Sequence, residues 1–121
     1  MPKCVLIVDD AASIRGLVSM TLRNEGYEVV EAVDGKDALN KLSEKRVNMV
    51  VSDLNMPNMD GIELLRIMKA NPVLKFTPVV MLTTEGADKK KREGQAAGAK
   101  AWMVKPFKPD TLVKVVKKII G

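Results

Sequence analysis

Carboxylate, hydroxyl and ammonium side chains stand directly after short apolar runs in this 121-residue chain. If the fold brings them together, several carboxylates meet in one place. Two unit charges about 4 Å apart repel by about 4 kcal/mol at an effective dielectric constant of about 20, so such a cluster requires a cation. Oxygen ligands without nitrogen or sulfur favour Mg²⁺ or a similar ion over zinc. The side chains concerned are Asp9, Asp10, Asp53, Thr83 and Lys105.

Phosphoryl transfer is the chemistry that this set of groups suits. A carboxylate nucleophile beside Mg²⁺, an ammonium and a hydroxyl can form an aspartyl phosphate. Asp53 and one of the two adjacent aspartates, Asp9 or Asp10, would bind the ion. A backbone carbonyl near Asn55 would add a ligand and leave positions for water and a substrate phosphate. Each residue alone has an ordinary structural explanation; aspartates, for example, are common in loops. The prediction of a phosphoryl-transfer site therefore depends on the convergence of all these residues in the fold.

The elements that must position these residues alternate regularly along the chain. Apolar or alternating segments predict strands at residues 5–8, 27–32, 49–51, 77–84 and 101–104, each followed by a helical pattern. Five such units of about 24 residues each predict a parallel sheet with helices on both faces. Ligands of such sheets bind beyond the carboxyl ends of the strands, where the candidate residues lie.

Capping residues predict where the helices begin and end. Ser13 and Asp60 are expected to cap the first and third helices. Gly26 should end the first helix, and the third should end before Pro72. Asp53 is expected at the exposed tip of a core strand, facing a crevice.

Composition excludes several classes of protein. The chain contains no histidine, so it cannot carry a phosphohistidine, a serine–histidine pair or a histidine metal ligand. Cys4 is the only cysteine, which rules out an internal disulfide, fits a reducing cytosol and suggests a small apolar residue in the first strand. No apolar run reaches the length of a membrane span, and no signal-peptide pattern is present.

The net charge of +5 is distributed unevenly. Residues 1–85 contain 10 basic and 12 acidic residues, whereas residues 86–121 contain 10 basic and 3 acidic residues. A basic third could attract an acidic protein, nucleic acid or a membrane surface, or simply form a solvated helix face. The chain has four aromatic residues in all and no motif of a DNA-recognition helix, so nucleic acid is not expected as a partner.

The motif set as a whole resembles the receiver domain of two-component response regulators, most closely the single-domain, CheY-like chemotaxis regulators. The resemblance rests on Asp9-Asp10, Asp53, Thr83 and Lys105-Pro106, and covers essentially the whole chain. It implies a flavodoxin-like α/β fold, a doubly wound five-stranded parallel sheet of strand order 2-1-3-4-5 with helices on both faces. Residues 1–121 would form a single receiver domain without an output domain.

The resemblance also implies roles at the acidic site. The segment from Asp53 to Gly61 looks like the phosphorylation loop, with Leu54 in place of a tryptophan. Asp53 would be the phosphoacceptor, and it would ligate Mg²⁺ directly together with Asp10 and the Asn55 carbonyl. Asp9 would act largely through bound water.

Further roles concern the phosphoryl group and the switch. Thr83 and Lys105 would each contact a phosphoryl oxygen, and the peptide bond between Lys105 and Pro106 would be cis. Thr83 and Trp102 would form the switch. Trp102 stands where the family more often has tyrosine or phenylalanine, so a switching contact that needs a phenol hydroxyl is in doubt. Asn55 and Glu85 would flank the attacking water and tune dephosphorylation.

The function implied is that of a stand-alone response regulator. A sensor histidine kinase would donate the phosphoryl group, and the protein would catalyse only its own phosphorylation and dephosphorylation. It would be a cytoplasmic monomer without nucleic-acid or membrane partners, and would signal in chemotaxis or motility by phosphorylation-dependent protein binding. The target would dock on the basic face formed by the fourth helix, fifth strand and fifth helix.

Three alternatives stay open. A phosphorelay intermediate would have the same sequence features. A haloacid-dehalogenase-type phosphatase would use similar groups, but it places a second aspartate two residues after the nucleophile, where this chain has Asn55. A flavodoxin-like FMN binder would need a phosphate loop rich in Ser, Thr and Gly after the first strand, which is lacking.

Overall fold

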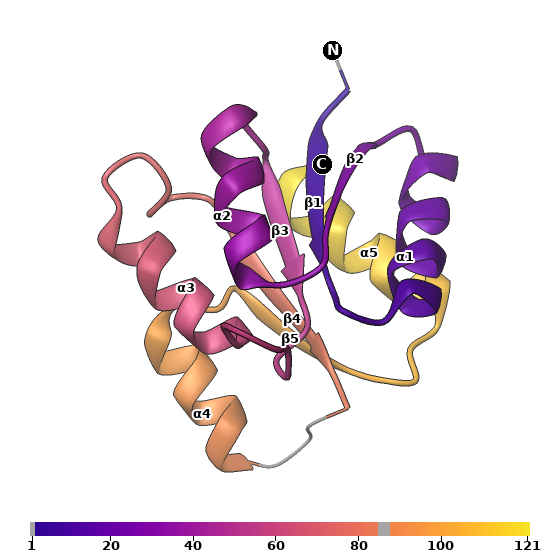
Figure 1. Cartoon of the computed structure of the whole chain (residues 1–121). Helices are drawn as coiled ribbons and strands as arrows, with labels where there is room; N and C mark the ends of the chain where they lie inside the picture. Colours follow the sequence, from indigo (N-terminus) through magenta and orange to yellow (C-terminus); the bar gives the residue numbers. More distant parts are fainter. Residues whose placement is uncertain (1, 85–87) are drawn as a thin grey trace.

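The computed structural model describes residues 2–84 and 88–121, in which strands and helices alternate from one end to the other (Figure 1). The elements are β1 (Cys4–Val8), α1 (Ala12–Asn24), β2 (Glu28–Ala32), α2 (Gly35–Glu44), β3 (Met49–Ser52), α3 (Gly61–Ala70), β4 (Val79–Thr83), α4 (Asp88–Ala97), β5 (Ala101–Val104) and α5 (Pro109–Ile120). Every predicted strand and helix is present, with ends within a few residues of the predicted ones.

The strands form one parallel sheet in the order β2-β1-β3-β4-β5, which confirms the predicted flavodoxin-like topology. Helices α1 and α5 cover one face, and α2, α3 and α4 cover the other (Figure 1). Val8 at the end of β1 is opposite Ser52 of β3 and Ala32 of β2. The carboxyl ends of the central strands therefore meet at one edge.

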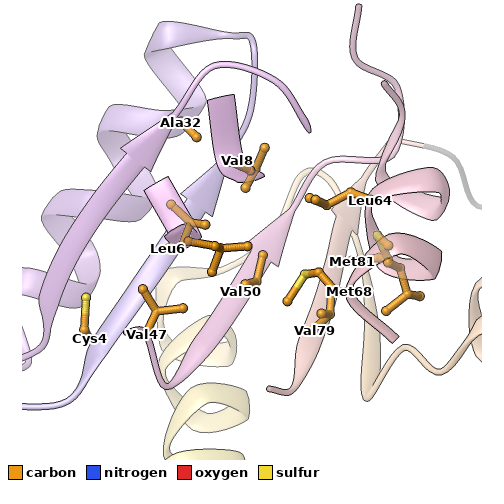
Figure 2. Close-up of a cluster of buried hydrophobic side chains, with 13 residues drawn as sticks. Cys4, Leu6, Val8, Ala32, Val47, Val50, Leu64, Met68, Val79 and Met81 are labelled. Carbon is orange, nitrogen blue, oxygen red and sulfur yellow. The ribbon is translucent and has the colours of Figure 1, made fainter. Parts of the chain in front are cut away.

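Alternate residues of the strands enter two apolar cores. Leu6 and Val50 pack with Leu64 and Met68 of α3 on the face shown in Figure 2. Val5, Ile7 and Val51 belong to the second core, with Leu22 of α1 and Leu112 and Val116 of α5. Burial of each Leu or Ile side chain contributes about 1.5–3 kcal/mol. These two cores hold the strand ends, and hence the site, in a fixed register.

Cys4 lies in β1 and is buried, as predicted. Burial raises the pKa of its thiol, while the positive charge of Lys45 acts in the opposite direction. In the described part of the chain, no helix is both long and apolar enough to span a membrane.

The predicted caps are confirmed at one helix and wrong at another. Asp60 accepts a hydrogen bond from the Glu63 N–H at 2.8 Å and caps α3. Helix α1, however, is not capped by Ser13, because it already begins at Ala12 and Ala11 occupies the cap position without a side-chain bond. The Asp9 carboxylate accepts from the Ala11 N–H at 2.9 Å, so the chain turns into the helix earlier than the sequence suggested.

Candidate acidic site at the carboxyl end of the sheet

The end of the sheet formed by β1 and β3 brings the predicted carboxylates together. The Asp53 N–H donates to the Val8 carbonyl at 2.8 Å, which places the residues following the two strands side by side. One carboxylate oxygen from each of Asp9, Asp10 and Asp53 lies within 4.8 Å of the others. This arrangement is the convergence that the sequence predicted, and its all-oxygen donors suit Mg²⁺.

Asp53 is less accessible than predicted. It follows β3 directly but is only 9 % exposed. Its carboxylate accepts from the Leu54 N–H at 2.8 Å. Burial is the main cause that raises the pKa of the Asp53 carboxyl; Lys105 lowers it, and the negative charges of Asp9 and Asp10 raise it further. The expectation of an exposed strand tip was therefore wrong, although the residue does stand at the predicted end of β3.

Lys105, between β5 and α5, supplies a positive charge to this cluster. Its Nζ lies 2.8 Å from Asp9 Oδ2 and 3.6 Å from Asp53 Oδ1. The Lys105–Pro106 peptide bond is cis, as predicted. Three carboxylates facing one ammonium leave an excess of negative charge, which a divalent cation would offset.

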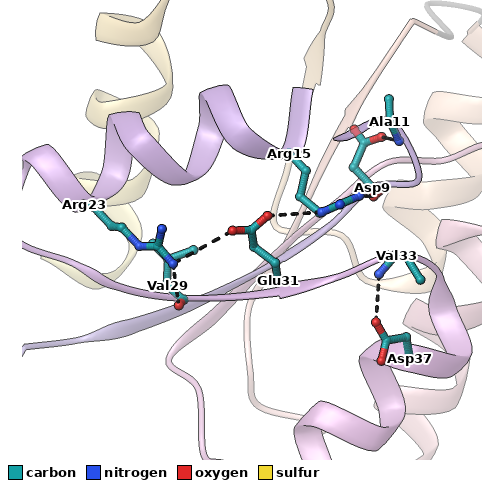
Figure 3. Close-up of polar contacts among 8 residues, drawn as sticks. All are labelled: Asp9, Ala11, Arg15, Arg23, Val29, Glu31, Val33 and Asp37. Atoms are coloured by element: carbon teal, nitrogen blue, oxygen red, sulfur yellow. Dashed lines mark hydrogen bonds and ion pairs between the residues drawn. The ribbon is translucent and has the colours of Figure 1, made fainter. Parts of the chain in front are cut away.

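Arg15 of α1 is a contributor that sequence reasoning missed. Its Nη1 donates to the main-chain oxygen of Asp9 at 2.8 Å, and its Nε donates to Glu31 of β2 at 3.1 Å (Figure 3). Arg15 thus ties the segment that carries Asp9 to the neighbouring strand. No sequence pattern points to it, because both contacts depend on how α1 lies across the sheet.

The structure fixes only the chain positions of the remaining predicted residues. Thr83 is the last residue of β4 and pairs with Val104 of β5. Asn55 is exposed in the loop between β3 and α3. Glu85 lies outside the described residues. The roles predicted for these residues stay predictions.

Trp102 of β5 is half-buried, and its ring lies against α4 at Gly94. A Cβ atom at Gly94 would lie 2.5 Å from Cζ3 of Trp102, so only glycine leaves room for the ring. The indole Nε1 is buried and has no hydrogen-bond partner among the described residues. Its predicted role in the switch is not tested by this geometry.

Comparison with known proteins agrees with this fold. Residues 5–117 match the family model described as the response regulator receiver domain. Among curated proteins, the chain is 39% identical to the transcriptional regulatory protein ResD of Bacillus subtilis over 116 residues, 96% of this chain and 47% of ResD. It is 33% identical to protein PilG of Pseudomonas aeruginosa over 113 residues, 93% of this chain and 84% of PilG. The chain therefore spans about half of ResD and most of PilG.

A solved structure is similar over nearly its full length. The chemotaxis protein CheY4 of Vibrio cholerae superposes with a TM-score of 0.93 at 47% identity, covering 98% of this chain and 99% of that chain. The chain belongs to the response regulator receiver domain family. Receiver domains take a phosphoryl group from histidine kinases and bind downstream targets, and they are signalling proteins of two-component systems. Within this family, the present chain is CheY-like.

Proposed function

We propose that this receiver domain accepts a phosphoryl group on Asp53 from a sensor histidine kinase, and that the phosphorylated form signals by binding a target protein. The observation that carries the proposal is the carboxylate cluster of Asp9, Asp10 and Asp53 with Lys105 beside it. The low exposure of Asp53 limits the water that competes for an incoming phosphoryl group.

In the proposed reaction, an Asp53 carboxylate oxygen attacks phosphorus while the bond from phosphorus to the phosphohistidine nitrogen breaks. The products are an aspartyl phosphate and the free histidine of the kinase. The Lys105 ammonium, now 3.6 Å from Asp53, would pair with a phosphoryl oxygen, and Thr83 would contact another. Hydrolysis by water would release inorganic phosphate and restore Asp53, with Asn55 and Glu85 tuning its rate.

Mg²⁺ bound at this cluster would neutralise charge that builds up between the carboxylates and the phosphoryl oxygens. Asp10, Asp53 and the Asn55 carbonyl would hold the ion directly. Asp9 already pairs with Lys105 at 2.8 Å, which supports its assignment to a water-mediated contact.

A protein target is proposed to dock on the face made by α4, β5 and α5. Among the side chains of this face that the structure describes, four basic ones are exposed: Lys91, Arg92, Lys114 and Lys118. Lys117 is exposed too but pairs with Glu25 at 2.8 Å, and this contact raises the pKa of its ammonium. The basic surface favours an acidic partner.

A role in chemotaxis or motility is supported by the similarity to CheY4, whose chain is matched over 99% of its length, and to PilG. We also propose that this domain acts as a monomer in the cytoplasm. Trp102 would report phosphorylation through Thr83, as the family resemblance implies.

Labelling with acetyl phosphate tests the proposal. With Mg²⁺, intact-mass analysis should show one added phosphoryl group, which alkali removes. The Asp53→Asn variant, or added chelator, should abolish it, whereas Asp110→Asn, which changes an exposed carboxylate, should label normally. Full labelling of Asp53→Asn, or labelling that chelator does not affect, would rule the proposal out.

A further inference from the structure

The loop between β3 and α3 is fixed at its base and at its tip. At the base, the Gly61 N–H donates to the Leu54 carbonyl at 2.8 Å. At the tip, Asn58 and Met59 contact the start of α2, far away in the sequence. The loop carries Asn55, so what holds its tip also bears on the position of the Asn55 carbonyl.

A hydrogen bond joins the tip to the residue that caps α2. Nδ2 of Asn58 donates to Oδ2 of Asp34 at 2.9 Å. The other carboxylate oxygen of Asp34 accepts from the Asp37 N–H at 2.8 Å and caps the helix. Asp34 therefore connects the loop to a helix end that is itself fixed. The bonds from the Asp37 N–H and from Asn58 lower the pKa of Asp34, so it is an anionic acceptor at neutral pH.

Two backbone features make this contact specific. Asn58 has φ of 69°, in the left-handed region that asparagine adopts more readily than most residues. Next to it, Met59 lies on Gly35, where an added Cβ would be 2.8 Å from the Met59 side chain. Only glycine at the first position of α2 lets the loop tip approach this closely.

We propose that Asn58 and Asp34 form a clamp that positions the phosphorylation loop, and so sets the affinity of the acidic site for Mg²⁺. This inference rests on the proposed function, because it takes the Asn55 carbonyl as a ligand. Asn58 is a positioning residue: it acts on the ion only through the backbone between it and Asn55. Groups that orient metal ligands in this way typically change metal affinity by about 10–100-fold.

The Asn58→Asp variant separates positioning from charge. It keeps the side-chain shape but replaces the donor with a second carboxylate facing Asp34. An added negative charge would by itself tighten Mg²⁺ binding, whereas loss of the clamp weakens it. We expect the Mg²⁺ dissociation constant, measured by calorimetry, to rise about tenfold. Glycine tolerates the positive φ but has no side-chain donor, so Asn58→Gly should also raise the Mg²⁺ dissociation constant.

A swapped pair provides the rescue. In Asp34→Asn combined with Asn58→Asp, the donor and acceptor exchange places, the net charge equals that of the parent, and asparagine still caps α2. Its dissociation constant should return to within about threefold of the parent value, a recovery well inside the range for such orienting groups. Equal or tighter Mg²⁺ binding by Asn58→Asp, or no recovery in the swapped pair, would overturn the clamp.

Hydrogen exchange of the metal-free protein keeps the two proposals separate. The Gly61 N–H, bonded to Leu54, should exchange faster in Asn58→Asp and return to the parent rate in the swapped pair. If the parent binds no Mg²⁺, the proposed function fails, and this exchange rate alone decides on the clamp. An unchanged rate would then refute it.

Discussion

Replacing Asp53 with asparagine should stabilise the metal-free fold, because the parent places this carboxylate among like charges. Asp53 lies 3.6 Å from the Lys105 ammonium and within 4.8 Å of carboxylate oxygens of Asp9 and Asp10. At an effective dielectric constant of about 20, the attraction is about 4.5 kcal/mol and each repulsion about 3.5 kcal/mol. The two repulsions exceed the attraction by about 2.5 kcal/mol, and the burial of a charged group adds to the cost.

Urea unfolding at pH 7 with chelator measures this difference. Asparagine is close to aspartate in size and keeps an oxygen that can accept from the Leu54 N–H, so packing should be preserved. We expect the free energy of unfolding to rise by about 2.5 kcal/mol in Asp53→Asn. The control, Asp110→Asn, removes the same charge from an exposed site in the first turn of α5, where a carboxylate is favourable, and should lower the free energy of unfolding by no more than about 1 kcal/mol.

The pH dependence has a definite sign. The folded protein raises the pKa of Asp53 above its ordinary value of 3.8, so the unfolded chain loses this proton first as pH rises. Between the two pKa values the unfolded state binds fewer protons, and the stability of the parent falls with rising pH. The advantage of Asp53→Asn should be absent below pH 3.8 and complete above the folded pKa. A variant that is no more stable than the parent at pH 7 without metal would refute this electrostatic reasoning.

Two further predictions concern packing. Gly94→Ala would normally favour a helix, but the new Cβ would lie 2.5 Å from the Trp102 ring. We therefore expect the free energy of unfolding, measured by heat or urea, to fall by about 1–3 kcal/mol and the tryptophan emission to shift. An unchanged emission would contradict the contact between Gly94 and Trp102. Leu64→Ala removes a fully buried side chain of the core between the sheet and α3. It should lower the free energy of unfolding in urea by about 3 kcal/mol. A decrease of less than about 1 kcal/mol would show that this core is not closely packed.

The sequence predicted the sheet because its apolar runs are short, rich in β-branched residues and regularly separated by helical patterns. Once the strands are parallel, Asp9 and Asp53 lie at the same edge of the sheet, and they meet there because β1 and β3 are neighbours. The convergence of the acidic site was therefore predictable from residue order together with the expected strand order.

Features that depend on contacts between distant segments were not predictable. The low exposure of Asp53 results from its surroundings in the folded chain. The bonds made by Arg15, and the bond from Asn58 to Asp34, depend on how neighbouring segments lie in space. The error at Ser13 has a local cause, because the Asp9 carboxylate accepts from the Ala11 N–H and the helix begins two residues earlier than predicted.

Asp53 is proposed to be the residue that receives the phosphoryl group. The most direct test of this role is to phosphorylate the protein with acetyl phosphate and Mg²⁺, reduce the acyl phosphate with borohydride, and map the modified residue by peptide mass analysis. Reduction converts a phosphorylated aspartate to homoserine, so homoserine is expected at position 53, with Asp9 and Asp10 unmodified. Homoserine at position 9 or 10 with Asp53 unmodified would contradict it.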